Sequence, residues 1–241
     1  NELTEKSLAA YDTFEFHIIY HALYNYCTLD LSAFYLDILK DRLYTSAPGS
    51  AERKSAQTVL HAVLDSIARI MAPILPFTAD EIWKYMPMIK GKEESIHIAL
   101  LPVSIKERKD DRLAGRWKKI LEVRGEVTKA LEEARIKKLI GHSLDASVTL
   151  AAESDLITLL EDYSGELRSV FITSRVSLSR DGSLPGAYES RDIKGLYVLV
   201  EPSGGKKCER CWMYDLSVGL IADEPEICGR CRDALDEINK A

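Results

Sequence analysis

Four of the five cysteines fall in two pairs near the C-terminus, and their spacing predicts a metal site. Cys208 and Cys211 form one C-x2-C pair, and Cys228 and Cys231 form a second one after sixteen intervening residues. This spacing is typical of zinc sites with four cysteine ligands, because each short turn directs two sulfurs toward one ion. Four thiolates complete the tetrahedron, so we expect one structural zinc ion per chain. Disulfides and buried free thiols are the alternatives.

Several cations and an aromatic residue surround the predicted zinc site. Basic groups beside an aromatic ring suit single-stranded nucleic acid, since the cations hold phosphates and the ring stacks on a base. The alternative is that Trp212 packs inside the small module, and the net charge of −2 over residues 206–241 opposes a simple electrostatic clamp. The candidate contacts here are Trp212, Lys206, Lys207, Arg210, Arg230 and Arg232.

A long helix expected from residue 106 to 139 supplies a second group of cations. Residues 104–140 hold 12 Lys and Arg against 7 Asp and Glu, a net charge of +5. Such a run is usually a solvated helix face with ion pairs four residues apart. A face that follows a phosphate backbone is the alternative. The candidate phosphate contacts are Arg116, Lys119, Arg124, Lys137 and Lys138.

The other residues of chemical interest form no persuasive catalytic pattern. His17 and His21 lie four residues apart, but Ile18 stands where a zinc protease has Glu, so we expect ordinary helix packing. Cys27 is expected to be a small buried side chain on a helix. The sequence has no phosphate-binding loop, nucleophile elbow or dinucleotide fingerprint. We therefore assign no catalytic residue.

The elements before residue 104 predict an antiparallel bundle of about four helices. Apolar residues recur at helical spacing through residues 1–88, with breaks near Pro48 and Pro73. Ser50 fits the N-cap of one helix. Thr78 and Glu81 fit a capping box, which places the start of the next helix at Thr78.

After the long helix, which Gly141 is expected to end, the apolar period changes and predicts a small α+β unit. Strands are expected at residues 146–150, 170–178 and 196–200, with a short helix at 155–162. The predicted fold class is thus mainly α: an antiparallel helical bundle, then a small α+β junction and a four-cysteine zinc module.

The three parts of this fold have predicted boundaries. We place the bundle at residues 1–103, the junction with its long helix at 104–203, and the zinc module at 204–241. The chain begins at Asn1 rather than Met, which suggests a processed product or an excised fragment.

Composition limits the class of protein. The 241 residues are 46% hydrophobic and 29% charged, as in ordinary globular proteins. No apolar run approaches the ~20 residues of a membrane span, and the polar start is unlike a signal peptide, so we expect a cytoplasmic protein without membrane contact. The net charge of −6 opposes nucleic-acid binding only as an average, because residues 104–140 are basic.

Several stretches, in consistent order along nearly the whole chain, carry a resemblance to a known family. They are residues 25–37 (NYCTLDLSAFYLD), 40–44 (KDRLY), 53–60 (RKSAQTVL), 72–83 (APILPFTADEIW), 123–135, 138–146, and the cysteine motifs 207–212 (KCERCW) and 228–231 (CGRC). These stretches resemble the C-terminal region of bacterial-type isoleucyl-tRNA synthetase, a class I aminoacyl-tRNA synthetase. Residues 72–83 are similar to a stretch shared with the valine and leucine enzymes, and the cysteine module narrows the resemblance to isoleucine.

The resemblance implies that the chain holds the anticodon stem-loop of a tRNA for isoleucine. Its longer parent would activate isoleucine with ATP and charge the tRNA in a catalytic domain, whose HIGH and KMSKS signatures do not occur in these residues. The expected partners are tRNA and the rest of the parent synthetase, and a monomer is expected. The alternatives are a valyl or leucyl counterpart, a DNA-repair glycosylase of the formamidopyrimidine type, and a zinc-stabilised protein-interaction module.

Overall fold

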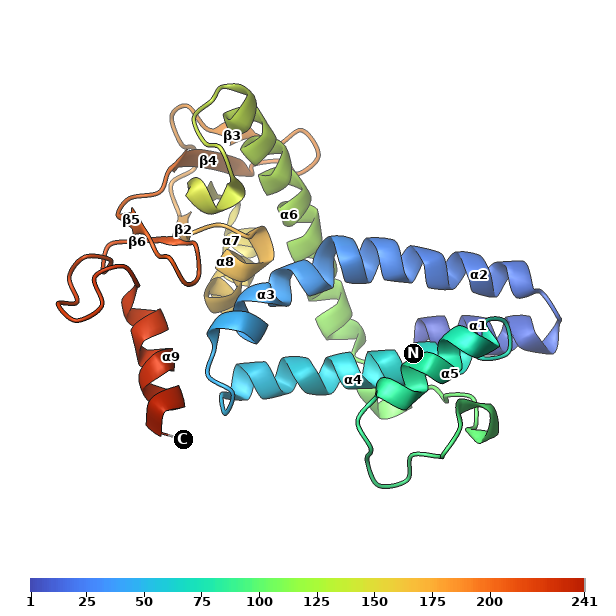
Figure 1. The fold of residues 1–241 in the computed structure, drawn as a ribbon. Helices are drawn as coiled ribbons and strands as arrows, with labels where there is room; N and C mark the ends of the chain where they lie inside the picture. The colour runs from blue at the N-terminus through green and yellow to red at the C-terminus, as the bar shows by residue number, and fades with distance from the viewer. Residues whose placement is uncertain (241) are drawn as a thin grey trace. The chain divides into compact units, whose positions relative to one another are not determined.

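The chain is mainly helical and forms two compact units. The structure, a computed structural model, describes residues 1–240. One unit comprises Asn1–Asp37 and Gly49–Asp110, and the other comprises Ile38–Pro48 and Asp111–Ala241. Figure 1 shows the helices and strands, coloured by their position along the chain. The mainly α class is confirmed, whereas the three-part division at residues 103 and 203 stays a prediction.

The first unit is a bundle of helices that cover two apolar clusters. Its α-helices are α1 (Glu2–Asp12), α2 (Phe16–Asn25), α4 (Ala51–Met71) and α5 (Pro76–Tyr85). Helix α1 packs beside α2 and α4, and α4 packs beside α5. Ile19 and Ile70 are buried in one cluster, and Trp83 and Ile96 in the other. The Trp83 ring nitrogen also donates to the carbonyl of Glu93 at 2.8 Å, which fastens the connector after α5.

Between α2 and α3 (Leu36–Thr45) the chain is wound as a π-helix over Tyr26–Tyr35. The amide of Leu36 donates to the carbonyl of Leu31, five residues back, as this wider helix requires. The stretch contains no fully buried residue, and Cys27 is half-buried. The expectation of a buried Cys27 is therefore wrong, because the π-helical turns leave its face partly open.

The starts of α4 and α5 test two predicted caps. Ser50 caps α4 as predicted, since its hydroxyl accepts a hydrogen bond from the amide of Arg53 at 3.3 Å. The capping box at Thr78 is wrong, because α5 begins at Pro76 and Thr78 lies exposed in the first turn. Proline suits the first helical position, since its φ is fixed and no amide hydrogen is needed there.

The long helix of the second unit, α6 (Asp111–Ile136), is shorter than predicted at both ends. At its C-terminal end Lys138 adopts the left-handed conformation with φ 59°, and the amide of Leu139 donates to the carbonyl of Ala134 at 2.9 Å. This backbone closure ends the helix. Gly141 is therefore not the residue that stops it.

One side of α6 is buried, whereas Leu121 of the same helix is exposed and Trp117 is half-buried. The buried residues of the helix are Ile120, Val123, Glu126, Val127, Ala130, Leu131 and Ala134. A buried carboxylate among them is a feature that the apolar pattern could not indicate.

A four-stranded sheet follows α6, in the spatial order β2-β1-β4-β3. Its elements are β1 (Ala146–Ala151), α7 (Ser154–Asp162), α8 (Ser164–Phe171), β2 (Arg175–Ser179), β3 (Tyr188–Glu189) and β4 (Tyr197–Pro202). Strands β1 and β2 are parallel, and β4 is antiparallel to both β1 and β3. Helix α6 packs on β4, while α7 and α8 pack on β2.

The strand predicted over residues 170–178 is wrong in its first half. Val170 lies in α8, and Ile172 leaves the helix in the left-handed conformation with φ 56°. The strand begins only at Arg175. Val170 and Ile172 are two positions apart and so resemble the alternation of a strand, although Val170 is a buried residue of helix α8.

None of the helices in the described part of the chain combines the length and apolar character that crossing a lipid bilayer requires.

Candidate metal centre and nucleic-acid interface

The four cysteines lie in a module built from a two-stranded ladder and a helix. Strand β5 (Lys206–Lys207) pairs antiparallel with β6 (Tyr214–Asp215), and α9 (Gly229–Lys240) begins directly after Cys228. Gly205 directly precedes β5 and has φ 90°, and a Cβ at that position would collide with the Asp215 carbonyl. Glycine is required there both for its backbone conformation and for this close approach.

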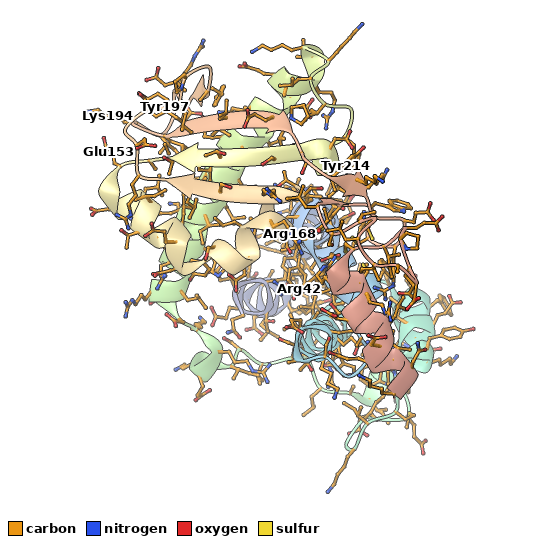
Figure 2. All side chains as sticks on the ribbon, turned by 90° about the vertical axis from the view of Figure 1, so that its left-hand side faces the viewer. Arg42, Glu153, Arg168, Lys194, Tyr197 and Tyr214 are labelled. Carbon is orange, nitrogen blue, oxygen red and sulfur yellow. The ribbon has the colours of Figure 1, made fainter. Side chains whose placement is uncertain are left out.

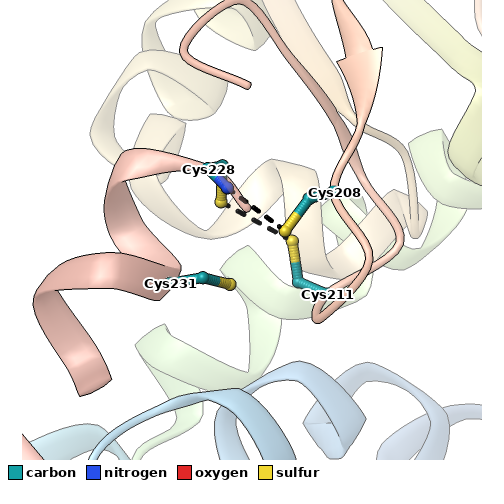
Figure 3. A group of neighbouring side chains, drawn as sticks. All are labelled: Cys208, Cys211, Cys228 and Cys231. Carbon is teal, nitrogen blue, oxygen red and sulfur yellow. Dashed lines mark hydrogen bonds between the residues drawn. The ribbon is translucent and has the colours of Figure 1, made fainter. Parts of the chain in front are cut away.

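The geometry of the sulfurs fits one metal ion (Figure 3). All four Sγ atoms lie within 4.8 Å of one another, and those of Cys211 and Cys228 are 3.8 Å apart. A tetrahedral zinc ion with Zn–S bonds of about 2.3 Å separates its sulfurs by roughly 3.8 Å. Cys208, Cys228 and Cys231 are buried, and the amide of Cys228 donates to the Cys208 sulfur at 3.3 Å. The cysteines are free rather than paired as disulfides.

The thiols influence each other's ionisation. Hydrogen bonds from Cys211 and Cys231 lower the pKa of Cys228 to about 3. Its contacts with Cys211 and Cys228 raise the pKa of Cys231. One thiolate is thus stabilised by its neighbours and opposes the ionisation of the others. Four thiolates so close together need a cation to balance their charge, which is the chemistry of a metal centre.

Trp212 follows the second cysteine and points away from the core of the module. Its side chain is 62% exposed, and its backbone is left-handed with φ 64°. The Lys207 ammonium lies 5.9 Å from the ring centroid. This exposure favours stacking over packing within the module, and the role of Trp212 stays a prediction. An open ring beside a cation is available for stacking on a base.

Arg210 and Arg230, by contrast, are engaged inside the second unit. Arg210 donates to the carbonyl of Thr45 at 2.5 Å. Arg230 donates to both carboxylate oxygens of Asp41, at 2.9 and 2.7 Å, and to the Thr45 hydroxyl at 3.1 Å. Both guanidinium groups thus reach the last turn of α3. Their place beside the cysteines was predicted, but these partners were not.

Four further predicted cations are held by neighbours in the same unit. The pairs are Arg116 with Asp162 (2.5 Å), Arg124 with the carbonyl of Val170 (3.0 Å), Lys137 with Glu133 (3.4 Å), and Arg232 with Glu224 (3.4 Å) and Asp236 (3.2 Å). Exposed ion pairs contribute little and exchange partners readily. These residues are consequently weaker candidates for phosphate contacts than unpaired lysines.

The remaining predicted lysines are exposed, and the structure brings members of the two cation groups together. Lys119, Lys138, Lys206 and Lys207 form no ion pair with any residue in the described range. Lys138 lines a shallow groove of about 510 Å³ together with Arg135 and Tyr214. Tyr214 in turn pairs with Lys207 across the β5–β6 ladder. Figure 2 shows Tyr214 and Lys194 at opposite ends of the four-stranded sheet.

Sequence reasoning missed Asp41, Thr45 and Tyr214. Asp41 lies within the KDRLY stretch, so the only signal was its presence in a segment already quoted for resemblance. His17 and His21 are both exposed and belong to no metal-ligand cluster among residues 1–240.

The fold and the site together define a mainly helical protein that ends in a four-cysteine metal module. Residues 1–150 match the family model described as the anticodon-binding domain of tRNA ligase, and residues 205–234 match the zinc finger found in FPG and IleRS. The chain belongs to the family of anticodon-binding domains of tRNA ligases.

Three of its curated relatives share one name. Isoleucine–tRNA ligase of Geobacter sulfurreducens is 50% identical over 97% of this chain and 25% of its own length. That of Desulforamulus reducens is 44% identical over 100% of the chain and 26% of its own length, and that of Moorella thermoacetica is 43% identical over 95% and 25%. The chain therefore spans about a quarter of the length of these relatives. The resemblance inferred from the residues is confirmed.

Proposed function

We propose that this chain recognises the anticodon stem-loop of a tRNA for isoleucine, as part of an isoleucyl-tRNA synthetase. The observation that carries the proposal is the succession of an anticodon-binding region and a zinc finger in one chain, along which isoleucine–tRNA ligases align from end to end. The zinc finger alone is shared with FPG, but the anticodon-binding match over residues 1–150 favours a synthetase over a DNA-repair glycosylase.

The exposed groups of the second unit supply suitable chemistry. Bases of an anticodon loop are unstacked, so an open ring such as Trp212 can stack on one of them. Lys206, Lys207 and Lys138 are exposed and, in this proposal, hold phosphates and set the register of the RNA. The engaged arginines position the module instead of meeting RNA directly.

The metal held by the four cysteines is, in this proposal, one structural zinc ion. It would cross-link the β5–β6 turn to the start of α9 and leave no open coordination position. Residues that activate isoleucine with ATP would belong to the parent enzyme outside these 241 residues. Cytoplasmic location and a monomeric state complete the proposal.

RNA binding tests the proposal directly. The chain should bind an isoleucine tRNA with an affinity that falls linearly on a log–log plot against salt concentration. Trp212→Ala should weaken binding by about 1–3 kcal/mol. Leu220→Ala is the matched control, because Leu220 is an 80% exposed apolar residue of the same module. Equal affinities of the wild type and Trp212→Ala would remove the stacking role.

Competing nucleic acids distinguish the alternatives. At matched salt, we expect tRNA for isoleucine to bind more tightly than tRNA for valine or leucine, and more tightly than duplex DNA. Preference for duplex DNA would support the glycosylase-like alternative. No binding to any nucleic acid would leave a protein-interaction module. Metal analysis should find one zinc per chain, and a metal-free protein with paired cysteines would refute the site.

A further inference from the structure

The two cysteine pairs share a feature beyond their spacing. Each reads C-x-R-C, so that Arg210 directly precedes Cys211 and Arg230 directly precedes Cys231. A ligand set of four cysteines fixes the two turns relative to each other once a metal is bound. The two arginines, each directly before a ligand, are thereby fixed relative to each other.

Both arginines contact the same helix end. Arg230 forms a two-pronged pair with the Asp41 carboxylate, and Arg210 donates to the main-chain carbonyl of Thr45. Thr45 also donates its hydroxyl to Asp41 at 2.9 Å and accepts a bond from Arg230 at 3.1 Å. Positive groups at a helix C-terminus are favourable, because the last carbonyls lack partners within the helix.

The ion pair between Arg230 and Asp41 is largely shielded from solvent. The Asp41 side chain is only 15% exposed and that of Arg230 37%. Arg168 of α8 adds a third cation, 3.9 Å from the same carboxylate. Forked arginine–carboxylate pairs of this kind are geometrically specific.

We propose that Asp41 is a positioning residue that couples metal binding in the cysteine module to the last turn of α3. Bound zinc fixes the conformation of the two C-x-R-C turns. Their arginines then bind Asp41 and Thr45, and these contacts order residues 38–48. The same contacts also fix the module from which Trp212 and Lys207 project. This last step rests on the proposed recognition of tRNA, whereas the coupling rests only on the proposed zinc site.

The test compares Asp41→Asn with the wild-type chain, both loaded with zinc. Asparagine keeps the shape of the side chain and removes its charge. Loss of a charge-assisted pair corresponds to roughly a tenfold change in an equilibrium constant or more. We expect the variant to lose zinc to a competing chelator at about a tenfold lower chelator concentration, and the amides of residues 38–48 to exchange hydrogen faster while zinc is still bound.

A matched control is available on the surface of the same unit. Glu161→Gln removes the same kind of forked pair, since Arg180 donates to Glu161 at 3.0 and 2.5 Å, but this pair does not touch the cysteine module. Zinc transfer and exchange in residues 38–48 should match the wild type. Wild-type behaviour of Asp41→Asn in both measurements would overturn the proposal.

Two further measurements keep the outcome decisive. If Asp41→Asn also exposes the amides of β1, general unfolding has occurred, and Arg230→Lys replaces it, because lysine keeps the charge without the fork. Zinc transfer and amide exchange in residues 38–48, measured on Arg230→Lys, then decide whether the proposal holds. Binding of isoleucine tRNA is measured in parallel: if the wild type fails to bind, the proposed function fails while the zinc measurements still judge the coupling.

Discussion

Glu126 provides a quantitative test of the packing in the second unit. This carboxylate lies on α6 and is only 3% exposed. It accepts hydrogen bonds from the Ser190 hydroxyl at 2.6 Å, the Tyr188 hydroxyl at 3.1 Å and the Lys129 ammonium at 2.6 Å. The network therefore joins the helix to the segment around β3. We predict that Glu126→Gln destabilises this unit while leaving its fold intact.

The magnitude follows from the charge that glutamine lacks. The Ser190 and Tyr188 hydroxyls both donate to Oε2, and an amide oxygen in that place can still accept from both, but as a neutral acceptor. Loss of the charge weakens each of these two bonds by about 1 kcal/mol, so the total cost is about 1.5–3 kcal/mol. Lys129 is half exposed, so its contribution is small. For a protein of this size, such a loss lowers the unfolding midpoint by roughly 3–12 °C. Glu122→Gln, an exposed position one turn earlier on α6, should have almost no effect.

The difference in stability between the wild type and Glu126→Gln should depend on pH in a defined direction. Burial alone would raise the pKa of Glu126, but the bonds from Lys129, Ser190 and Tyr188 outweigh it and lower the pKa. A carboxylate with a lowered folded pKa stabilises the protein above its unfolded pKa of about 4.3, and this contribution disappears as the pH falls through the folded value.

Urea unfolding, followed by the fluorescence of Trp117 in the same unit, measures the effect. The gap between the wild type and Glu126→Gln should be constant from pH 6 to 8, as the folded and unfolded carboxyls are both ionised there. It should narrow below about pH 4. If Glu126→Gln and Glu122→Gln unfold at the same urea concentration at pH 7, the reasoning about the buried network is refuted.

Three further substitutions test local backbone arguments. Gly205→Ala should destabilise the cysteine module by more than about 1 kcal/mol, because alanine disfavours φ 90° and its Cβ would collide with the Asp215 carbonyl. The expected result is slower zinc uptake while the stability of α6 is unchanged. Zinc uptake at the wild-type rate would contradict the prediction. Ser50→Ala should lower the stability of the first unit by about 1 kcal/mol through loss of a cap, whereas Thr78→Ala should change it by less than about 0.5 kcal/mol. Thermal unfolding distinguishes these two variants, and equal losses would contradict the assignment of α5 to a proline start.

Features set by neighbours in the sequence were predictable. The two C-x2-C pairs are close in the chain, so a turn of a few residues suffices to bring each pair of sulfurs together, and the structure collects all four. Ser50 acts on an amide three residues away. In both cases the spacing itself fixes the geometry.

The errors occurred where two local patterns competed. Thr78 and Glu81 satisfied the capping-box pattern, but Pro76 already supplied a suitable first residue, and the helix began there. Val170 and Ile172 alternated like a strand, but the helix α8 extended to Phe171 before the chain turned. Local patterns of this kind differ by small free energies, and tertiary packing selects between them.

The sequence by itself determined the metal module, the helical class and the family, since these depend on residue types at short spacing or in a fixed order. Only the tertiary structure decided what each predicted cation does. Arg230 and Asp41 are 189 residues apart, and no periodic pattern links them, because their contact exists only after the chain has folded. The same folding left Trp212 exposed while it buried three of the four cysteines of the module, since a small module has too little interior to cover both.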